Sequence, residues 1–532
     1  MMTKKIPHTY ALIFYIIIFS AILTWFIPGG EFDKEFITIN NSEQEVIIAG
    51  TYHPVESKAQ TWEIFSAFYK GFIDKSEIII FIFMVGGAFM IVGKSRAIDA
   101  GIFAFLKATT KMEKIKFFKK VGVENLILSS IMLIFSIFGA VFGMSEETIP
   151  FVLIIVPLAI SMGYDSITGV ALVFVAAAMG FAGAILNPFT IGVAQGIAQL
   201  ALFSGIKYRL FSWVIINIFG ISYILIYAKK IKKHPEKSLV CPDDLYWRQR
   251  ESATINHIEY KRTKSSIFVF ALVFIFMIYQ SYENTITIFT FGLEKFKFPL
   301  IPILTVFFAI SSFFSIKKSA HFFVLNLFAF TIIFLVAGVM AYGWYMMEIA
   351  TLFMALGIFA GISMADSSNK IVSHFLEGVK DIASAALIVG LAGGIIEILN
   401  DGKIIDTILY ETSNSFDGFS KVSSISLMYI FQTILNLFIP SGSGQAALTM
   451  PIMSPLADLM NIPRQAAVMA FQFGDGFTNM ITPTSGVLMG VLSVAKIPYD
   501  KWFKWMFPFL IGLIIIAFLL LIPTVTMSLN GF

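Results

Sequence analysis

Four short polar stretches interrupt apolar sequence at places where a membrane-spanning helix would carry none of them, and they contain the residue types that could bind a charged ligand. Two are the tips of apolar hairpins, Ser145-Glu146-Glu147-Thr148 and Ser441-Gly442-Ser443-Gly444-Gln445; the other two lie around Gly183 to Thr190 and Gly474 to Ser485. A broken helix inside a bilayer leaves backbone groups unpaired at several kcal/mol each, so it persists only where it lines protein or a wet cavity. The four breaks therefore predict one binding cavity.

The residues of these breaks indicate a ligand with unlike ends. Each hairpin tip begins a second helical arm, and a helix N-terminus offers free N–H groups and a partial positive charge of about +0.5, which can hold a carboxylate. Glu146, Glu147 and Asp475 place acidic groups at membrane depth, where a carboxylate usually marks a ligand or ion pathway. A cationic amino acid fits both features, whereas a dicarboxylate fits them poorly.

The predicted substrate-binding residues are those in the tips and breaks that carry a hydroxyl, amide, carboxylate or free N–H group. They are Ser145, Glu146, Glu147, Thr148, Asn187, Ser441, Gly442, Ser443, Gly444, Gln445, Asp475, Asn479, Thr482 and Thr484. For any one stretch, a tight turn between packed helices is an equally good interpretation. Two matched pairs of stretches favour a ligand site.

Composition assigns the chain to the polytopic, all-α membrane proteins. It has 532 residues, of which 57% are hydrophobic and 14% charged, and its mean hydropathy is +0.82. We expect eleven crossings, the first being a retained helix from Tyr10 to Ile27. Most Lys and Arg residues fall in segments on one side if the N-terminus is cytoplasmic, which predicts that orientation.

Several other functions find no support in the sequence. The single cysteine, Cys241, lies in a polar segment, and the six histidines fall in loops or at the ends of spans, so we expect no metal site, no cofactor and no catalytic base. No HExxH motif is present, and the Ser-Gly runs form no nucleophile element, which argues against a membrane enzyme. The basic stretches 111 to 120 and 229 to 237 are interpreted as anchors on anionic lipid rather than as nucleic-acid sites.

An internal repeat organises the chain. Residues 68 to 102 match residues 375 to 409 at eight of 35 positions without a gap. A Gly-Gly dipeptide in each copy (residues 86–87 and 393–394) and two aspartates in each copy are among the matches. The hairpins and broken helices then recur in the same order. An odd number of crossings separates the two copies, so we expect them to be inverted, an arrangement typical of secondary transporters with a site at the repeat interface.

The predicted domain organisation follows from this repeat. Residues 1–228 form the first repeat, with hairpin 123–162 and broken helix 166–204, and residues 343–526 form the second, with hairpin 422–461 and broken helix 464–496. Between them lie a cytoplasmic basic linker at 229–265 and inserted helices at 266–341. Each hairpin is expected to re-enter the membrane rather than cross it.

Long motifs carry a family resemblance over nearly the whole chain. The stretches "GMSEETIPF", "GWYMMEIATLFMALGIFAGI" and "PSGSGQAALTMPIMSPLADLMNIPRQAAVMAFQFGDGFTNMITPTSG" resemble the YfcC-like branch of the anaerobic C4-dicarboxylate carrier family, within the ion-transporter superfamily. The resemblance implies basic amino acid antiport, with arginine/ornithine exchange in some members. It also implies a homodimer with a scaffold domain and a transport domain that moves like an elevator. The spans near 266 to 315 depart from the family pattern.

Taken together, these observations predict exchange of a cationic amino acid pair, most simply arginine for ornithine, by alternating access. The predicted partners are a small-molecule substrate, membrane lipid and a second copy of the chain. A proton- or sodium-coupled dicarboxylate transporter stays open as the alternative, because the same architecture serves dicarboxylates. An intramembrane enzyme is the alternative from another class.

Overall fold

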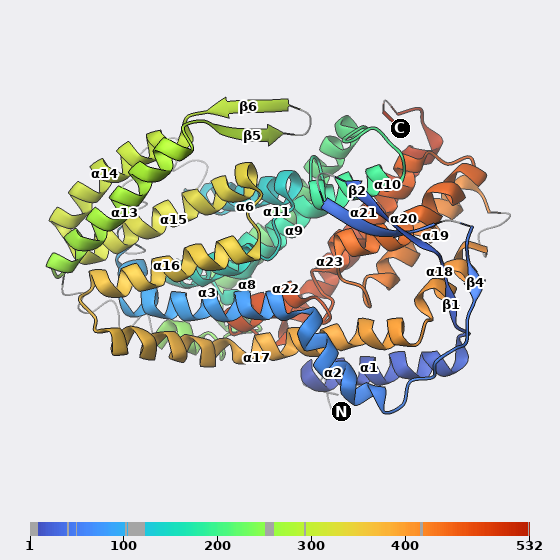
Figure 1. The fold of residues 1–532 in the computed structure, drawn as a ribbon, viewed down its shortest axis with the longest axis horizontal. Coiled ribbons are helices and arrows are strands. Elements are labelled where there is room, and N and C mark those ends of the chain that lie inside the picture. Colours follow the sequence, from blue (N-terminus) through green and yellow to red (C-terminus); the bar gives the residue numbers. More distant parts are fainter. Residues whose placement is uncertain are drawn as a thin grey trace.

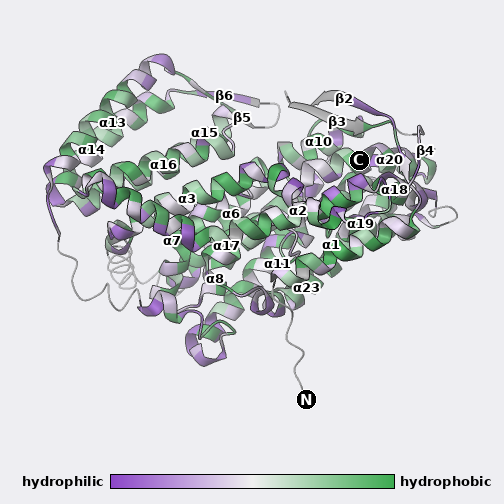
Figure 2. Cartoon of the chain, turned by 60° about the horizontal axis from the view of Figure 1, so that its bottom comes forward, coloured by the Kyte–Doolittle hydropathy of each residue, from purple (hydrophilic) through white to green (hydrophobic). Residues whose placement is uncertain are grey.

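The chain is a multi-pass helical membrane protein. A computed structural model describes residues 9–39, 42–48, 50–101, 104, 123–249, 260–291, 294–414, 419–529 and 531–532. Within those ranges, nine helices are long and apolar enough to cross a membrane, or ten if one bent pair forms a single span. Hydrophobic residues colour almost every long helix, and hydrophilic ones gather at helix ends and connections (Figure 2). The predicted fold class is confirmed at this level.

The first half contains the first hairpin and the first broken helix. Its helices are α1 (Thr9–Phe26), α2 (Glu63–Asp74), α3 (Ser76–Lys94), α6 (Val123–Phe142), α7 (Thr148–Ser161), α8 (Ser166–Val170), α9 (Ala176–Gly183), α10 (Val193–Ile197) and α11 (Ile206–Lys233). The π-helical segment Ala171–Val175 joins α8 to α9, and the π-helical turn Pro188–Gly192 leads into α10. The break between α9 and that turn comes where the sequence predicted it.

The second half repeats this order after the inserted helices. Its helices are α13 (Lys264–Glu283), α14 (Leu300–Lys318), α15 (Ala320–Tyr342), α16 (Met346–Ser363), α17 (Ser368–Asp401), α18 (Ile405–Asn414), α19 (Lys421–Leu435), α20 (Gly442–Leu459), α21 (Arg464–Thr478), α22 (Gly486–Val494) and α23 (Tyr499–Thr526). In Figure 1, α13 and α14 lie at one end of the molecule and α18 to α20 at the other, with α3, α16 and α17 running side by side between them.

Glycines of the two repeats pack against one another where α2 and α3 meet α17. A Cβ atom on Gly71 would lie 2.3 Å from the backbone nitrogen of Gly394, and one on Gly378 would lie 2.5 Å from the carbonyl oxygen of Gly86. Gly71 and Gly378 are matched positions of the repeat, as are the two Gly-Gly pairs. Gly71 meets Gly394, whereas Gly86, which comes later in the first copy, meets Gly378, which comes earlier in the second. The two copies therefore run antiparallel at this contact.

The hairpins and broken helices also pack reciprocally. The first arm of each hairpin contacts the first half of the broken helix in its own copy, as α6 does with α9 and α19 with α21. The second arm contacts the last half of the broken helix in the other copy, as α20 does with α10 and α7 with α22. This exchange brings residues of both copies together at the breaks. Inversion of the repeats across the membrane and elevator motion stay predictions.

Several details differ from the sequence prediction. Three two-stranded sheets, which the sequence did not predict, join β1 (Gly30–Glu31) to β4 (His53–Pro54), β2 (Lys34–Ile39) to β3 (Ser42–Ile47) and β5 (Thr287–Phe291) to β6 (Glu294–Phe298). Helix α11 continues to Lys233, past the predicted start of the linker. Helix α6 has 20 residues, enough for a whole span rather than half of one. The basic stretch 111 to 120 lies outside the described residues.

Candidate functional site

The first hairpin tip lies against the first helix break. Ala184 ends α9 in the left-handed conformation, and the backbone N–H of Leu186 then donates to the carbonyl of Ala140 in α6, 3.0 Å away. Asn187 caps the following turn, its Oδ1 accepting from the backbone N–H of Phe189 at 2.9 Å. Gly143 at the tip has a φ of +69°, and a Cβ there would lie 2.5 Å from the Asn187 Oδ1. A glycine is therefore required where tip and break meet.

The second hairpin tip lies between the two breaks. A Cβ atom on Gly442, the first residue of α20, would lie 2.6 Å from Cγ2 of Thr190 in the first break and 3.1 Å from Oδ2 of Asp475 in α21. Asp475 accepts a hydrogen bond from Asn479 Nδ2 on its Oδ1 at 2.9 Å. The structure thus brings together Gly442, Asp475 and Asn479, which the sequence predicted, with Thr190, which it did not single out.

Buried polar atoms without a protein partner gather in these two breaks. Asp475 and Asn187 have no exposed surface and Thr190 is 1% exposed, yet Asp475 Oδ2, Asn187 Nδ2 and Thr190 Oγ1 make no hydrogen bond. Oδ1 of Asn479 is also buried and unpaired. Nearly all buried polar groups in proteins are paired, and exceptions of this kind occur at functional sites. The breaks therefore form the candidate ligand site.

The two glutamates of the first tip lie in a different neighbourhood. Glu147 is 6% exposed, and its Oε2 accepts from the backbone N–H of Ser145 at 2.9 Å. Glu77 at the start of α3 and Tyr345 before α16 are close enough to act electrostatically on the tip. Among the described residues, neither glutamate makes a hydrogen bond or ion pair with Asp475. Both hairpin tips adjoin the first break, the first at Gly143 and Asn187 and the second at Gly442 and Thr190.

Sequence comparison decides the family. A family model described as the C4-dicarboxylate anaerobic carrier, DcuC, matches residues 6–321 and 315–526. The chain belongs to this carrier family. It is accordingly a membrane transporter, as the hairpins and broken helices predict.

Relatives of this carrier match over nearly their whole length. YfcC of Escherichia coli (strain K12), named provisionally as a basic amino acid antiporter, is 30% identical over 94% of this chain and 92% of its own. An uncharacterized protein of Haemophilus influenzae is 28% identical over 99% of this chain and 98% of its own.

Two solved structures are similar at lower identity. MtrF of Neisseria gonorrhoeae, from a class of antimetabolite efflux pumps, has 16% identity and a TM-score of 0.36, covering 99% of this chain and 97% of its own. The YdaH transporter of Alcanivorax borkumensis has 13% identity and a TM-score of 0.38, covering 97% and 98%.

The other predicted residues of this carrier hold the tips and breaks in shape. Ser441 caps α20, its Oγ accepting from the backbone N–H of Gly444 at 3.4 Å. Gln445 Nε2 donates to Oε1 of Gln432 at 2.7 Å and so joins the two arms of the second hairpin. Thr484 donates to the carbonyl of Leu437 at 2.8 Å. Further predicted residues make local contacts or lie at the tip surface: Thr482 contacts Thr484, Thr148 donates to the Ser145 carbonyl, and Ser443 is half-buried.

Arg209, which the sequence prediction omitted, supports the first break of the carrier. It is 1% exposed, and its guanidinium donates from Nε to the carbonyl of Ala184 at 3.0 Å and from a terminal nitrogen to that of Ile185 at 3.3 Å. A buried guanidinium is costly unless its donors are satisfied. The only signal in the sequence was one basic residue at the start of an apolar run, which resembles an ordinary helix-end anchor.

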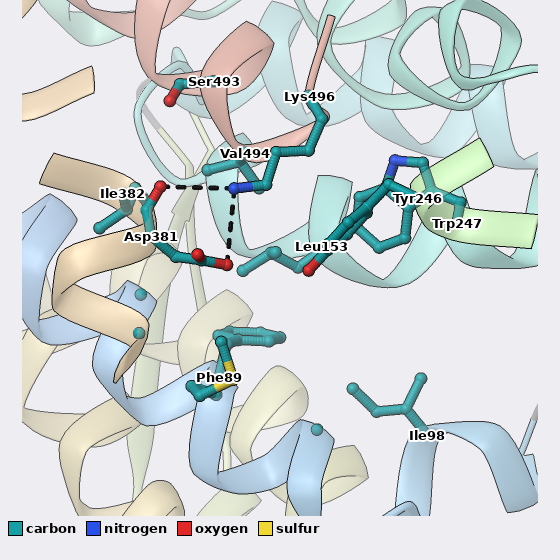
Figure 3. Close-up of a pocket in the computed structure, with 14 residues that line it drawn as sticks. Phe89, Ile98, Leu153, Tyr246, Trp247, Asp381, Ile382, Ser493, Val494 and Lys496 are labelled. Atoms are coloured by element: carbon teal, nitrogen blue, oxygen red, sulfur yellow. Dashed lines mark hydrogen bonds and ion pairs between the residues drawn. The ribbon is translucent and has the colours of Figure 1, made fainter. Parts of the chain in front are cut away.

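A cavity of about 600 Å³, including space open to solvent, lies apart from the breaks of this carrier. Apolar side chains such as Phe89 and Leu153 line it together with Tyr246 and an ion pair between Lys496 and Asp381 (Figure 3). None of the predicted site residues lines this cavity. It lies where α3, α7, α17 and α22 meet the linker that follows α11.

Proposed function

We propose that this carrier exchanges cationic amino acids, with arginine and ornithine as the preferred pair. The exchange takes place across the bacterial inner membrane by alternating access, with the N-terminus in the cytoplasm. The observation that carries the proposal is the acidic first tip, Glu146 and Glu147 beside Glu77, close to the start of α7. The name of YfcC agrees with this substrate class. A homodimer with elevator-type transport domains is part of the same proposal.

The roles of the site residues follow from their chemistry. The N–H groups at the start of α20, with the hydroxyls of Ser145 and Ser443, hold the α-carboxylate. At the start of α7, the N–H groups of Thr148 and Ile149 already donate to the carbonyls of Ser145 and Glu146. Glu146 and Glu147 face the side-chain cation, and Asp475 adds a negative charge at the second break. Without substrate, these carboxylates lack the substrate cation at membrane depth, with the charge of Lys75 acting on Glu146 alone as partial compensation. The unloaded carrier therefore crosses slowly, and exchange is favoured over net uptake.

Counterflow in proteoliposomes tests this function. Vesicles loaded with ornithine should accumulate labelled arginine, and external lysine should compete while succinate should not. Glu147→Gln should lower the initial rate at least tenfold, because it removes a negative charge that faces the substrate cation. Glu377→Gln is the matched control, since Glu377 makes an exposed ion pair with Lys94.

A dicarboxylate carrier is the second candidate, because the matching family is described by that substrate. Uptake of labelled succinate that arginine does not inhibit, with no arginine counterflow, would contradict the amino acid proposal and favour this one. Dependence of that uptake on a sodium or proton gradient would further support a coupled dicarboxylate transporter.

A further inference from the structure

The cavity beside the linker is separate from the helix breaks and has its own chemistry. Helices α3, α7, α17 and α22 form its walls together with the linker that follows α11. Phe89 and Leu153 belong to its apolar side, and Lys496 and Asp381 lie together at its polar side (Figure 3). One small molecule in this cavity would therefore meet an apolar surface and two opposite charges.

The two charges of the cavity are joined only loosely. Nζ of Lys496 lies 3.5 Å from Oδ2 and 3.3 Å from the backbone carbonyl oxygen of Asp381, whereas charge-assisted hydrogen bonds are typically about 2.8 Å long. The Lys496 side chain is 31% exposed and that of Asp381 is 46% exposed. An ammonium group and a carboxylate can each make further hydrogen bonds. Both side chains can thus bind a ligand without leaving one another.

A ligand with two opposite charges close together fits this pair. A carboxylate without an ammonium group would lie beside Asp381, and an ammonium group without a carboxylate would lie beside Lys496, so either ligand would meet a like charge. The head group of an α-amino acid presents its carboxylate to Lys496 and its ammonium group to Asp381. Every charge is then compensated, as partly buried charges require.

The apolar side of the cavity determines which amino acid fits. Among the described residues that line it, Asp381 and Lys496 are the only ones with ionised side chains. A guanidinium or a second carboxylate would be desolvated against Phe89 and Leu153 without a partner of opposite charge. Arginine and dicarboxylates are therefore poor ligands here, and an amino acid with an apolar side chain is a good one.

The size and exposure of the cavity favour a free amino acid over a lipid. Its enclosed part has room for roughly five water molecules, which suits the side chain of leucine but not the two acyl chains of a phospholipid. Ionised groups are costly in hydrocarbon, so the partly exposed pair of Lys496 and Asp381 faces water. The ligand would enter from that side.

We propose that this cavity binds a free α-amino acid with an apolar side chain, such as leucine, as a ligand distinct from the transported substrate. Its carboxylate accepts from Nζ of Lys496, its ammonium group donates to Asp381, and its side chain contacts Phe89 and Leu153. Bound in this way, it joins α17 to the segment that follows α22. No residue of the hairpin tips or helix breaks takes part, so the site does not depend on which substrate is carried.

Thermal unfolding of the purified full chain in detergent tests the site, with no arginine or ornithine present. L-Leucine should raise the unfolding midpoint by several degrees along a saturable curve, and titration calorimetry should give one leucine per chain. Glycine lacks the side chain, isocaproate the ammonium group and isoamylamine the carboxylate, so each should bind at least tenfold more weakly. Dihexanoylphosphatidylethanolamine, a short-chain lipid with both charges, should not displace leucine.

Variants locate the binding site. Leu153→Trp fills the apolar side and keeps both charges, so it should abolish the response to leucine. Lys496→Gln should weaken leucine binding at least tenfold. Lys94→Gln is the matched control and should keep it, because Lys94 pairs with Glu377 of the same helix α17 outside the cavity. Glu147→Gln, which alters the proposed transport site, should also keep it.

Several results would overturn the proposal. One is an unaltered chain whose midpoint ignores leucine, or that binds isocaproate as tightly as leucine; this result needs no variant and so does not depend on variant folding. Displacement of leucine by the short-chain lipid would assign the cavity to a lipid. Loss of binding in Glu147→Gln with full binding in Leu153→Trp would place leucine at the hairpin tips. Because arginine and ornithine are absent, these results leave the test of arginine exchange independent.

Discussion

At the scale of single residues, Arg209 shows how a broken helix is kept stable inside a membrane protein. Its guanidinium donates to four backbone carbonyls, those of Ala184, Ile185, Phe203 and Ser204. Those carbonyls belong to two short segments outside the helices, one after α9 and one before α11. One fixed cation thus replaces several missing backbone bonds.

Arg209→Met should therefore destabilise the folded chain by about 2–5 kcal/mol, since it leaves buried carbonyls without donors. Arg209→Lys should recover only part of this loss, because an ammonium lacks the planar fork of donors. The measurement is the midpoint of thermal unfolding in detergent. Lys94→Met serves as control and should cost under about 1 kcal/mol, as for other exposed ion pairs. Equal losses in the two methionine variants would contradict this account of Arg209.

Residue types alone predicted the acidic and hydroxyl groups of the candidate site but not how they are grouped. The sequence predicted Glu146, Glu147 and Asp475 in one cavity. The structure places Asp475 beside Gly442 and the tip glutamates near Glu77 and Tyr345, and a cavity common to them stays a prediction. The sequence also could not identify Thr190 or Arg209, because nothing in the local sequence shows that these side chains meet a break from another element. Which side chain meets which helix break depends on tertiary packing, and one sequence does not show that packing.

At the scale of elements, the linker after α11 ties the two halves together. Trp247 Nε1 donates to the carbonyl of Ala495, just after α22, at 3.1 Å, and Lys501 of α23 contacts Asp243 at 2.5 Å. Asp244 lies on the same segment and accepts from the backbone N–H of Ser166, the first residue of α8. The linker thus holds the start of one broken helix near the end of the other.

Docking of this linker should depend on pH through Asp244. Burial and, to a smaller extent, the nearby Asp165 raise the pKa of the Asp244 carboxyl from 3.8 to about 6, against the lowering effect of the hydrogen bond from Ser166. A folded-state pKa above the unfolded value means that protonation favours docking, so this contribution is lost as pH rises through about 6. Asp244→Asn should therefore raise the unfolding midpoint at pH 7.5, by up to roughly 3 kcal/mol in stability. At pH 5, which lies between the unfolded and folded pKa values, about half of this gain should remain.

Thermal unfolding at the two pH values provides the measurement, with Asp243→Asn as the neighbouring control. Asp243 is paired with Lys501, so its replacement should not stabilise the chain at pH 7.5. An Asp244→Asn variant that is equally stable relative to the unaltered chain at both pH values would show that this carboxyl does not control docking.

Elements were predictable where a strong local signal marks them. Gly and Pro residues flanked by apolar runs located both hairpin tips and both breaks. The sequence did not indicate the hairpin of β5 and β6, because alternating residues over five positions give little contrast beside long apolar helices. The extent of α6 was also missed, since hydropathy does not distinguish a half-depth arm from a full span when both are apolar.

At the scale of the whole molecule, matched positions of the two predicted repeats pack against one another. Matched glycines of the two copies meet across α2, α3 and α17, and each hairpin contacts the broken helix of the other copy. The sequence could predict the repeat because glycines at close helix contacts tolerate no other residue. It could not predict which surfaces of the repeats touch, because that depends on distances between elements far apart in the chain.

The proposed elevator motion can be tested at one contact, that between the end of α22 and α17. Lys496, just after α22, contacts Asp381 of α17, with Nζ 3.5 Å from Oδ2 and 3.3 Å from the backbone carbonyl (Figure 3). If the hairpins and broken helices move against α3 and α17, this pair must separate in every cycle. Cross-linking Asp381→Cys to Lys496→Cys in a Cys241→Ser background should abolish arginine counterflow, and cleaving the cross-linker should restore it.

The matched control joins α3 to α17, which the elevator model moves together. Lys94 Nζ lies 2.8 Å from Glu377 Oε1, so Lys94→Cys and Glu377→Cys can be linked by the same reagent. This second cross-link should leave counterflow near that of the unlinked variant. Counterflow that survives both cross-links would mean that α22 does not move against α17, and transport would then have to proceed by local gating at the hairpin tips. Loss of counterflow with the first cross-link alone would assign α17 to the static part and α22 to the moving part.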